Sequence, residues 1–271
     1  MDFKNCCLLL LSIIYVGCED VVELELPDSD PRLVIDASFA TTFNAGKIQT
    51  EGAVILSLSA PFYDTGNPPV NNATVYITNT TTDEVHNFIE VGDSGAYITQ
   101  YQWNPEFLSQ YVLTVISGNE TYEGTATLIP TVPLDEVQQG DGTLFSGEET
   151  EIVVKFTDNG SRDDHYLFDL DFNLYLTTED RFYQGEQFVF SYFYEDLDPG
   201  QEITVRINGV DRQYHDYMTL LIEQSGQNGS GPFQTLPSTL RGNMVNRTNP
   251  DNYAYGYFSL SERNELTLFI D

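Results

Sequence analysis

The segments QFVFSYFYED (residues 187–196) and QEITVRINGV (residues 201–210) alternate between apolar and polar side chains along most of their length. Successive side chains of a β-strand point to opposite faces, so this period of two residues predicts two strands, each with one buried face. Four aromatic residues share one face of the first segment and are expected in the core: Phe188, Phe190, Tyr192 and Tyr194.

The same alternation extends towards the N-terminus. Turn sequences such as GDSG (92–95) and SGNE (117–120) separate short alternating segments at the spacing typical of β-sandwiches. We therefore predict a β-sandwich over residues 32–130. Its expected strands are Leu33–Phe39, Val54–Ser59, Thr74–Asn79, Val85–Glu90, Ala96–Gln100, Tyr111–Ser117 and Thr121–Leu128.

Residues 131–149 contain prolines, glycines and acids without a clear period, which predicts a connection to a second domain over residues 150–271. Within that domain, apolar residues recur at helical spacing in QYHDYMTLLIEQ, so one helix is expected at 213–224. GYFSLS (256–261) and ELTLFID (265–271) are expected to close the chain as a pair of strands.

The charge balance is strongly acidic, with 42 Asp and Glu against 11 Lys and Arg and a net charge of -31. No Lys or Arg lies between Lys47 and Lys155. A nucleic-acid-binding protein needs a basic surface that contacts phosphates, so that class is excluded and no nucleic acid is expected as a partner.

The N-terminal region is typical of an export signal. Its apolar run from Cys6 to Val16 spans 11 residues, too short for the roughly 20 that cross a bilayer but suitable for a signal peptide. Tyr15, Val16 and Gly17 before Cys18 resemble a lipobox, although an aliphatic residue is usual at the place of Tyr15.

The cysteines agree with a lipoprotein. Cys6 and Cys7 lie in the predicted signal peptide (1–17), so the mature chain would keep Cys18 alone, as a lipidated residue rather than a free thiol. Acyl chains on Cys18 would anchor the protein at about 0.8 kcal/mol per buried CH₂. Residues 18–31 would then form the lipidated tether and first extended segment. An ordinary secretory signal is the alternative.

Several motifs resemble one family of Bacteroidota lipoproteins, catalogued as domain of unknown function 4249. The motifs are CEDVVELELPDSDPRLVIDASF (18–39), NNATVYITN (71–79), SGAYITQ (94–100), YVLTVISGNETYEGTATLIPTVPLDEV (111–137), YHDYMTLLIEQ (214–224), PFQTLPSTLRGNMVN (232–246) and NYAYGYFSLS (252–261). The resemblance implies a mainly β protein. Its N-terminal transthyretin- or Ig-like β-sandwich would precede a second β-sandwich or barrel-like domain with one packed helix.

The same resemblance implies where the protein is found and what accompanies it. Glu19 and Asp20 directly after the cysteine resemble the signal that displays such lipoproteins on the outer face of the outer membrane. The family often accompanies TonB-dependent receptors, so such a receptor is an expected partner. The family supplies no agreed activity and no catalytic residues.

One turn is a candidate metal site. DNGSRDDH offers oxygen ligands from Asp158, Asn159, Asp163 and Asp164, which suit Ca²⁺, although turns favour these residue types for backbone reasons alone. No other cofactor is expected. Residues 169–180 superficially resemble a calcium loop, but Leu174 stands where an EF-hand requires Gly, and the alternation there predicts a strand.

No motif for catalysis is present. The three histidines, His86, His165 and His215, stand in no zinc-binding pattern, and no G-x-S-x-G sequence occurs. In so acidic a chain any pair of carboxylates is uninformative, so a hydrolase that uses two carboxylates stays open.

Tyr101 and the single Trp103 lie in a polar, loop-like sequence. They are candidates for contact with a sugar or a partner protein, with burial of Trp103 between the sheets as the alternative.

Together with the family resemblance, the sequence predicts a non-enzymatic, surface-exposed outer-membrane lipoprotein, an accessory binding component of a TonB-dependent uptake system. A structural or adhesive surface protein is the alternative, and a carboxylate-dependent hydrolase is a third possibility.

Overall fold

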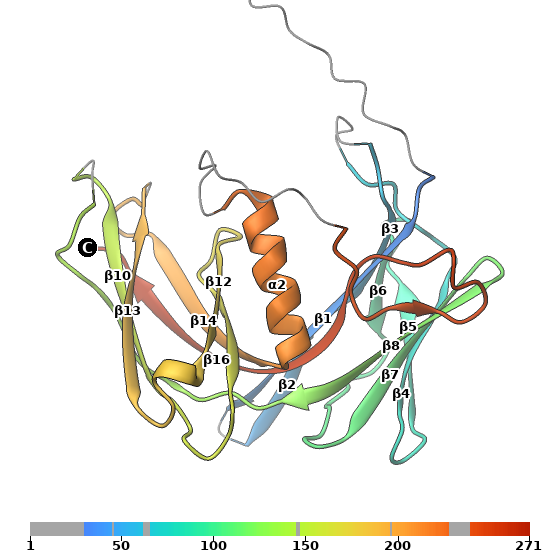
Figure 1. Cartoon of the computed structure of the whole chain (residues 1–271), viewed down its shortest axis with the longest axis horizontal. Helices are drawn as coiled ribbons and strands as arrows, with labels where there is room; N and C mark the ends of the chain where they lie inside the picture. The colour runs from blue at the N-terminus through green and yellow to red at the C-terminus, as the bar shows by residue number, and fades with distance from the viewer. Residues whose placement is uncertain (1–29, 45, 62–65, 145–146, 196, 228–238) are drawn as a thin grey trace, which may run out of the picture. The chain divides into compact units, whose positions relative to one another are not determined.

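The computed structural model describes residues 30–271 except 45, 62–65, 145–146, 196 and 228–238 (Figure 1). The described part is mainly β, with one sheet of 13 strands, a second sheet of three strands and a single long helix. The signal peptide, the lipobox, Cys18 and the export signal at Glu19 and Asp20 lie outside the described residues, so the statements about them stay predictions.

The first part of the chain forms a β-sandwich, as predicted. Its strands are β1 (Leu33–Asn44), β2 (Lys47–Gly52), β3 (Val54–Leu58), β4 (Thr74–Asn79), β5 (Val85–Glu90), β6 (Ala96–Thr99), β7 (Gln110–Ser117) and β8 (Glu120–Ile129). All seven expected strands are present, and β1 is longer than expected. β2 was not predicted, because its side chains are exposed or half-buried and carry no apolar alternation.

Alternate residues of these strands build one core. In β1, for example, Ile35, Ala37 and Phe39 are buried, while Asp36 and Ser38 between them are exposed. At the centre of the core, Trp103 meets Phe39 and Tyr111 edge-on, with ring centroids 5.3 and 5.5 Å apart. Edge-to-face aromatic pairs of this kind stabilise the fold by more than the burial of their surface area alone.

The second part of the chain has its own core. Its strands are β9 (Leu134–Gln139), β10 (Thr150–Thr157), β11 (His165–Asp169), β12 (Tyr175–Glu179), β13 (Gln187–Tyr194), β14 (Glu202–Val210), β15 (Val245–Asn246) and β16 (Phe258–Phe269), with a short 3₁₀ helix, η1 (Asp180–Phe182). β13, β10 and β9 form the small sheet. Phe188 and Phe190 of β13 pack against this core, as predicted, and Tyr194 is buried in it.

β16 belongs to both cores. Residues 258–262 pair in parallel with β1, and residues 263–269 pair antiparallel with β14 (Figure 1). The expected pair of closing strands is therefore one continuous strand, because Glu262–Asn264 extends the chain instead of turning it. Phe258 and Leu260 are buried in the first core, which the predicted boundaries had assigned to residues 32–130 alone. The predicted connection at 131–149 also contains a strand, β9.

The prediction of a single strand over residues 169–180 is wrong. Asp171, Phe172 and Asn173 have φ values of +65°, +51° and +59°, so the chain turns there and β11 returns as β12. Asp and Asn tolerate the left-handed region. The apolar alternation continued through the turn and hid it.

Helix α2 (Arg212–Ser225) confirms the helix predicted at 213–224. Asp211 caps its first turn by accepting a hydrogen bond from the backbone N–H of Tyr214 (2.7 Å), and Gly226 ends it in the left-handed conformation. Tyr214, Met218 and Ile222 face inward at i, i+4 and i+8. They pack with residues of β11, β14 and the segment before β16.

The segment before β16 is fixed by two glycines and one asparagine. A side chain at Gly242 would collide with the carbonyl of Gly256, which itself has a φ of +97°. Asn243 then pairs with the backbone of Phe258 through both atoms of its amide, each at 2.8 Å. This arrangement holds Tyr257 in a defined position beside α2.

Candidate functional site

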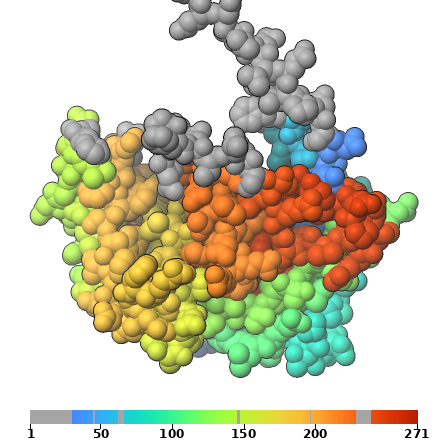
Figure 2. Space-filling view, in the orientation of Figure 1, coloured from blue at the N-terminus to red at the C-terminus, as the bar shows by residue number. Residues whose placement is uncertain are grey.

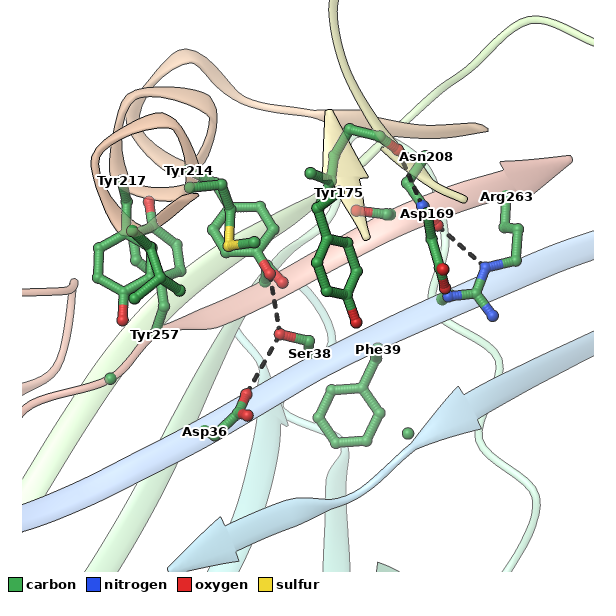
Figure 3. Close-up of a pocket in the computed structure, with 18 of the residues that line it drawn as sticks. Asp36, Ser38, Phe39, Asp169, Tyr175, Asn208, Tyr214, Tyr217, Tyr257 and Arg263 are labelled. Carbon is green, nitrogen blue, oxygen red and sulfur yellow. Dashed lines mark hydrogen bonds between the residues drawn. The ribbon is translucent and has the colours of Figure 1, made fainter. Parts of the chain in front are cut away.

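A pocket of about 520 Å³ lies between α2 and the strands β1, β2, β11, β12, β14 and β16 (Figure 3). The space-filling view shows the outer face of α2 on the surface, beside the segment that follows residue 238 (Figure 2). The polar and aromatic residues that line the pocket are Asp36, Ser38, Phe39, Glu51, Asp169, Tyr175, Asn208, Tyr214, Tyr217, Tyr257, Ser259, Ser261 and Arg263. Lining residues come from early and late parts of the described chain, residues 34–52 and 256–263.

Tyrosines form one wall. Tyr214 and Tyr217 lie one turn apart on α2, with their rings nearly parallel and centroids 6.2 Å apart. Tyr257 packs against both rings, at 4.7 and 5.0 Å. Tyr175, from the start of β12, stands between this group and the other end of the pocket (Figure 3). The wall therefore brings aromatic rings, packed on one another, together with phenolic oxygens.

A hydrogen-bonded chain connects β1 with this wall. Ser38 Oγ donates to Asp36 Oδ1 at 3.4 Å, and the Tyr214 hydroxyl lies 3.0 Å from Ser38 Oγ. Because the serine proton is directed to Asp36, the tyrosine acts as the donor in the second bond. Asp36 and Ser38 reach the pocket because β1 alternates, with Ile35 and Ala37 turned into the core.

The surroundings raise the pKa of Asp36 and of the tyrosines near it. Desolvation raises the pKa of Asp36, although the side chain is open to solvent inside the pocket. Desolvation also raises the pKa of Tyr217 to about 12, and the nearby charge of Asp36 adds to the rise. The same two causes raise the pKa of Tyr214 and contribute to the rise for Tyr175. All three phenols are therefore neutral near pH 7.

The opposite end of the pocket carries its only lining cation among the described residues, Arg263. Its Nε donates to Asn208 Oδ1 at 3.0 Å, and one terminal nitrogen lies 3.8 Å from Glu51 Oε2. Asn208 is held in turn by its bond to the carbonyl of Leu167 at 3.0 Å. Desolvation lowers the pKa of Arg263, and Asp169 partly offsets this. Arg263 is thus a partnered, positioned group.

The four residues predicted as a calcium site have other partners. Asp158 accepts hydrogen bonds from the Tyr166 hydroxyl (2.6 Å) and from the backbone of Gly185 (2.7 Å). Asp164 accepts from Arg162 at 2.9 Å and from Tyr166 at 3.1 Å.

The remaining two predicted ligands are also engaged. Asn159 accepts from Ser161, and Asp163 accepts from Gln184 at 3.2 Å. Within the described ranges, no three His, Cys, Asp or Glu side chains come together in a way that could hold a metal ion. The turn is therefore a hydrogen-bonded network, and calcium binding by these four residues stays a prediction.

Trp103 was a candidate contact residue, but the structure buries it at 3% exposure between the sheets, so the alternative reading was the correct one. Its indole ring is enclosed by Phe39, Tyr111 and His86. Its neighbour Tyr101 is 78% exposed, so contact with a partner stays a prediction for Tyr101 alone.

Reasoning from the sequence did not identify the pocket. In the sequence, Tyr214 and Tyr217 fit the spacing of the helix predicted at 213–224, and Asp36 is a polar position in the strand predicted at Leu33–Phe39. The available signal was the concentration of tyrosine on one helix face and again at 253–257. That they face Asp36 depends on β16 lying beside β1, which local patterns do not reveal.

A family model described as "Domain of unknown function (DUF4249)" matches residues 19–267. The chain belongs to this family, as the motifs had indicated. A search of curated proteins finds no match.

Two solved structures show a distant similarity. The chicken interferon gamma receptor alpha chain is 11% identical, over 67% of this chain and 89% of its own, with a TM-score of 0.18. The FN1–FN3 domains of chicken CNTN1 are 11% identical, over 66% and 59%, with a TM-score of 0.19. Similarities at this level say nothing about the fold or activity of this chain.

None of the described helices is long and apolar enough to cross a membrane.

Proposed function

We propose that this chain is a non-enzymatic lipoprotein, anchored through Cys18 and exposed on the surface of the outer membrane. There it serves as an accessory binding component of a TonB-dependent nutrient-uptake system. The anchor is supported by the lipobox-like sequence before Cys18 and by Glu19 and Asp20 after it. The family match, which starts at residue 19, agrees with a mature domain that begins at this point.

The observation that carries the binding role is the pocket beneath α2. Its volume of about 520 Å³ lies within the range of small-molecule sites. Its lining combines aromatic faces with a few fixed polar groups, which is the usual composition of a site that binds a ligand. Among its described lining residues there is neither His nor Cys, so a nucleophile paired with a histidine base is not available there.

Lipidation is tested by metabolic labelling with a palmitate analogue in a bacterium that lipidates its exported proteins. We expect the full-length protein to take up the label and Cys18→Ser to lose it. Cys7→Ser is the matched control and should be labelled like the wild type, because Cys7 lies in the predicted signal peptide. Equal labelling of Cys18→Ser, or an unlabelled wild type, would refute the anchor.

The partner is tested by affinity purification from native outer membrane in mild detergent, followed by mass spectrometry. A TonB-dependent receptor should co-purify in near-stoichiometric amount. Recovery of matrix or neighbouring-cell proteins without any receptor would instead support a structural or adhesive role.

A hydrolase is the second candidate, because three carboxylates line the same pocket: Asp36, Glu51 and Asp169. Most glycoside hydrolases use a pair of carboxyl groups in catalysis. Turnover of glycan or peptide substrates that disappears in Asp36→Asn would establish this candidate. We expect no turnover.

A further inference from the structure

We propose that the pocket beneath α2 takes a ligand with an organic ammonium group, which Asp36 and the surrounding tyrosines hold. This inference rests on the proposed binding role and names the ligand class for the same site.

The first argument is that Asp36 lacks a partner of opposite charge. Among the described residues its one hydrogen bond comes from Ser38 at the long distance of 3.4 Å. Within the described part of the chain, no hydrogen bond or ion pair joins it to Lys, Arg or His, and desolvation is the main cause of its raised pKa. The carboxylate faces the pocket without a basic partner from the described residues, so a ligand cation there would pair with a charge that the protein leaves unpaired.

The second argument is the aromatic composition of the pocket wall. The rings of Tyr214, Tyr217 and Tyr257 form one group with centroids 4.7 to 6.2 Å apart. The Asp36 carboxylate is linked to the Tyr214 hydroxyl through Ser38, at 3.4 and 3.0 Å, and the negative charge of Asp36 contributes to the raised pKa of Tyr175, Tyr214 and Tyr217. Aromatic faces beside a carboxylate are the usual surroundings of a bound ammonium group.

The third argument is the charge balance of the pocket. Its lining includes Asp36, Glu51 and Asp169 against the single lining cation Arg263 among the described residues. Asp169 is paired with Arg206 at 3.4 Å, which leaves Asp36 as the lining carboxylate without a basic partner among the described residues. Arg263 is already bonded to Asn208 and lies near Glu51, so it leaves little positive charge for an anionic ligand. An anion would also be repelled by the Asp36 end.

The rest of the lining defines the body of the ligand. Leu167, Met218 and Leu221 contribute apolar surface next to the tyrosines. An apolar or aromatic body that bears an ammonium group matches both parts of the pocket better than a polyhydroxylated sugar does.

Three probes that share one body separate these possibilities: phenethylammonium, the neutral 2-phenylethanol and the anionic phenylacetate. Affinity is measured by ligand-observed NMR or calorimetry at about 0.15 M salt, where the long-range field of the acidic protein is screened. We expect the cation to bind at least about tenfold more tightly than the alcohol, with no measurable binding of the anion.

Variants locate the effect. Asp36→Asn should abolish the preference for the cation, and Tyr217→Leu should weaken its binding about tenfold. Asp93→Asn removes one negative charge from an exposed turn outside the pocket and should bind like the wild type. The probe series needs only the wild-type protein, so the test does not depend on the folding of any variant.

Equal or tighter binding of the alcohol, or an unchanged preference in a folded Asp36→Asn variant, would overturn the inference. A cation preference lost equally in Asp93→Asn would also overturn it, because that result shows attraction to the overall charge. None of these results affects lipidation or receptor co-purification, so the proposed function can fail or stand separately.

Discussion

Asp36 shows how a single residue of a strand can serve both the fold and a site. The strand alternation buries Ile35 and Ala37, and the same alternation turns Asp36 towards the helix and the tyrosines. A carboxyl whose pKa is higher in the folded state than in the unfolded state binds its proton more tightly when folded. As the pH rises through the ordinary pKa of an aspartic acid and above it, the unfolded state loses this proton more readily than the folded state. The free energy of unfolding therefore falls.

Replacement of Asp36 by Asn should therefore stabilise the protein at neutral pH. We expect a small rise in Tm at pH 7, at most about 2 °C because water in the pocket screens the charge. The gain should shrink as the pH falls towards the ordinary value of an aspartic acid, where the wild-type group becomes protonated. Thermal unfolding from pH 4 to 8 measures this, and a gain that grows at low pH would contradict it.

Tyr166 is the residue on which the turn at 158–164 depends. Its buried hydroxyl lies within hydrogen-bonding distance of Asp158 and of Asp164. Both of these carboxylates are also buried. Tyr166→Phe leaves these carboxylates short of a donor, so we expect a loss of about 1–3 kcal/mol in the free energy of unfolding.

Urea unfolding measures this loss. Tyr101→Phe is the matched control, since that side chain is 78% exposed, and it should be neutral. Equal stability of the two variants would show that the network is not structural.

At the scale of elements, periodicity predicted most strands and the helix because each of them has one wet and one buried face. β2 and β9 were not predicted because their polar sequences carry no such pattern. The hairpin of β11 and β12 escaped for the opposite reason, since the apolar alternation runs through its turn. Burial of Trp103 and the joint use of β16 by two cores depend on pairings distant in sequence, which local patterns do not encode.

Helix α2 supplies one side of the pocket, so its capping affects the site. Asp211→Ala removes the side-chain acceptor for the Tyr214 N–H and should cost about 1 kcal/mol of stability. It should also weaken binding of phenethylammonium, because Tyr214 and Tyr217 lie in the first two turns. Glu223→Ala, at an exposed position of the same helix, is the control for both measurements. Loss of stability in the control but not in Asp211→Ala would contradict the capping role.

For residues 31–271 as a whole, β16 should couple the two cores during unfolding. Its residues 258–262 pair with β1 and its residues 263–269 with β14, so neither core can lose the strand without exposing the other. We expect one calorimetric transition, with a calorimetric to van't Hoff enthalpy ratio of about 1. Two separated transitions would show that the predicted domains at 32–130 and 150–271 unfold independently.

The site as a whole could not be predicted from the sequence, although its components were visible. Tyrosines on a helix, an aspartate in a strand and an acidic composition are each compatible with an ordinary surface. Their meeting in one pocket follows from the parallel pairing of β1 with β16, two strands separated by almost the whole described chain.

The central claim, that this pocket is where the protein binds its ligand, is tested most directly by NMR of the protein with labelled tyrosine rings. Titration with phenethylammonium should shift the ring signals of Tyr175, Tyr214, Tyr217 and Tyr257. It should leave in place the signals of the exposed Tyr101 and of Tyr122 in β8, neither of which lines the pocket. Shifts spread evenly over all the tyrosines, or confined to residues outside the pocket, would contradict the claim.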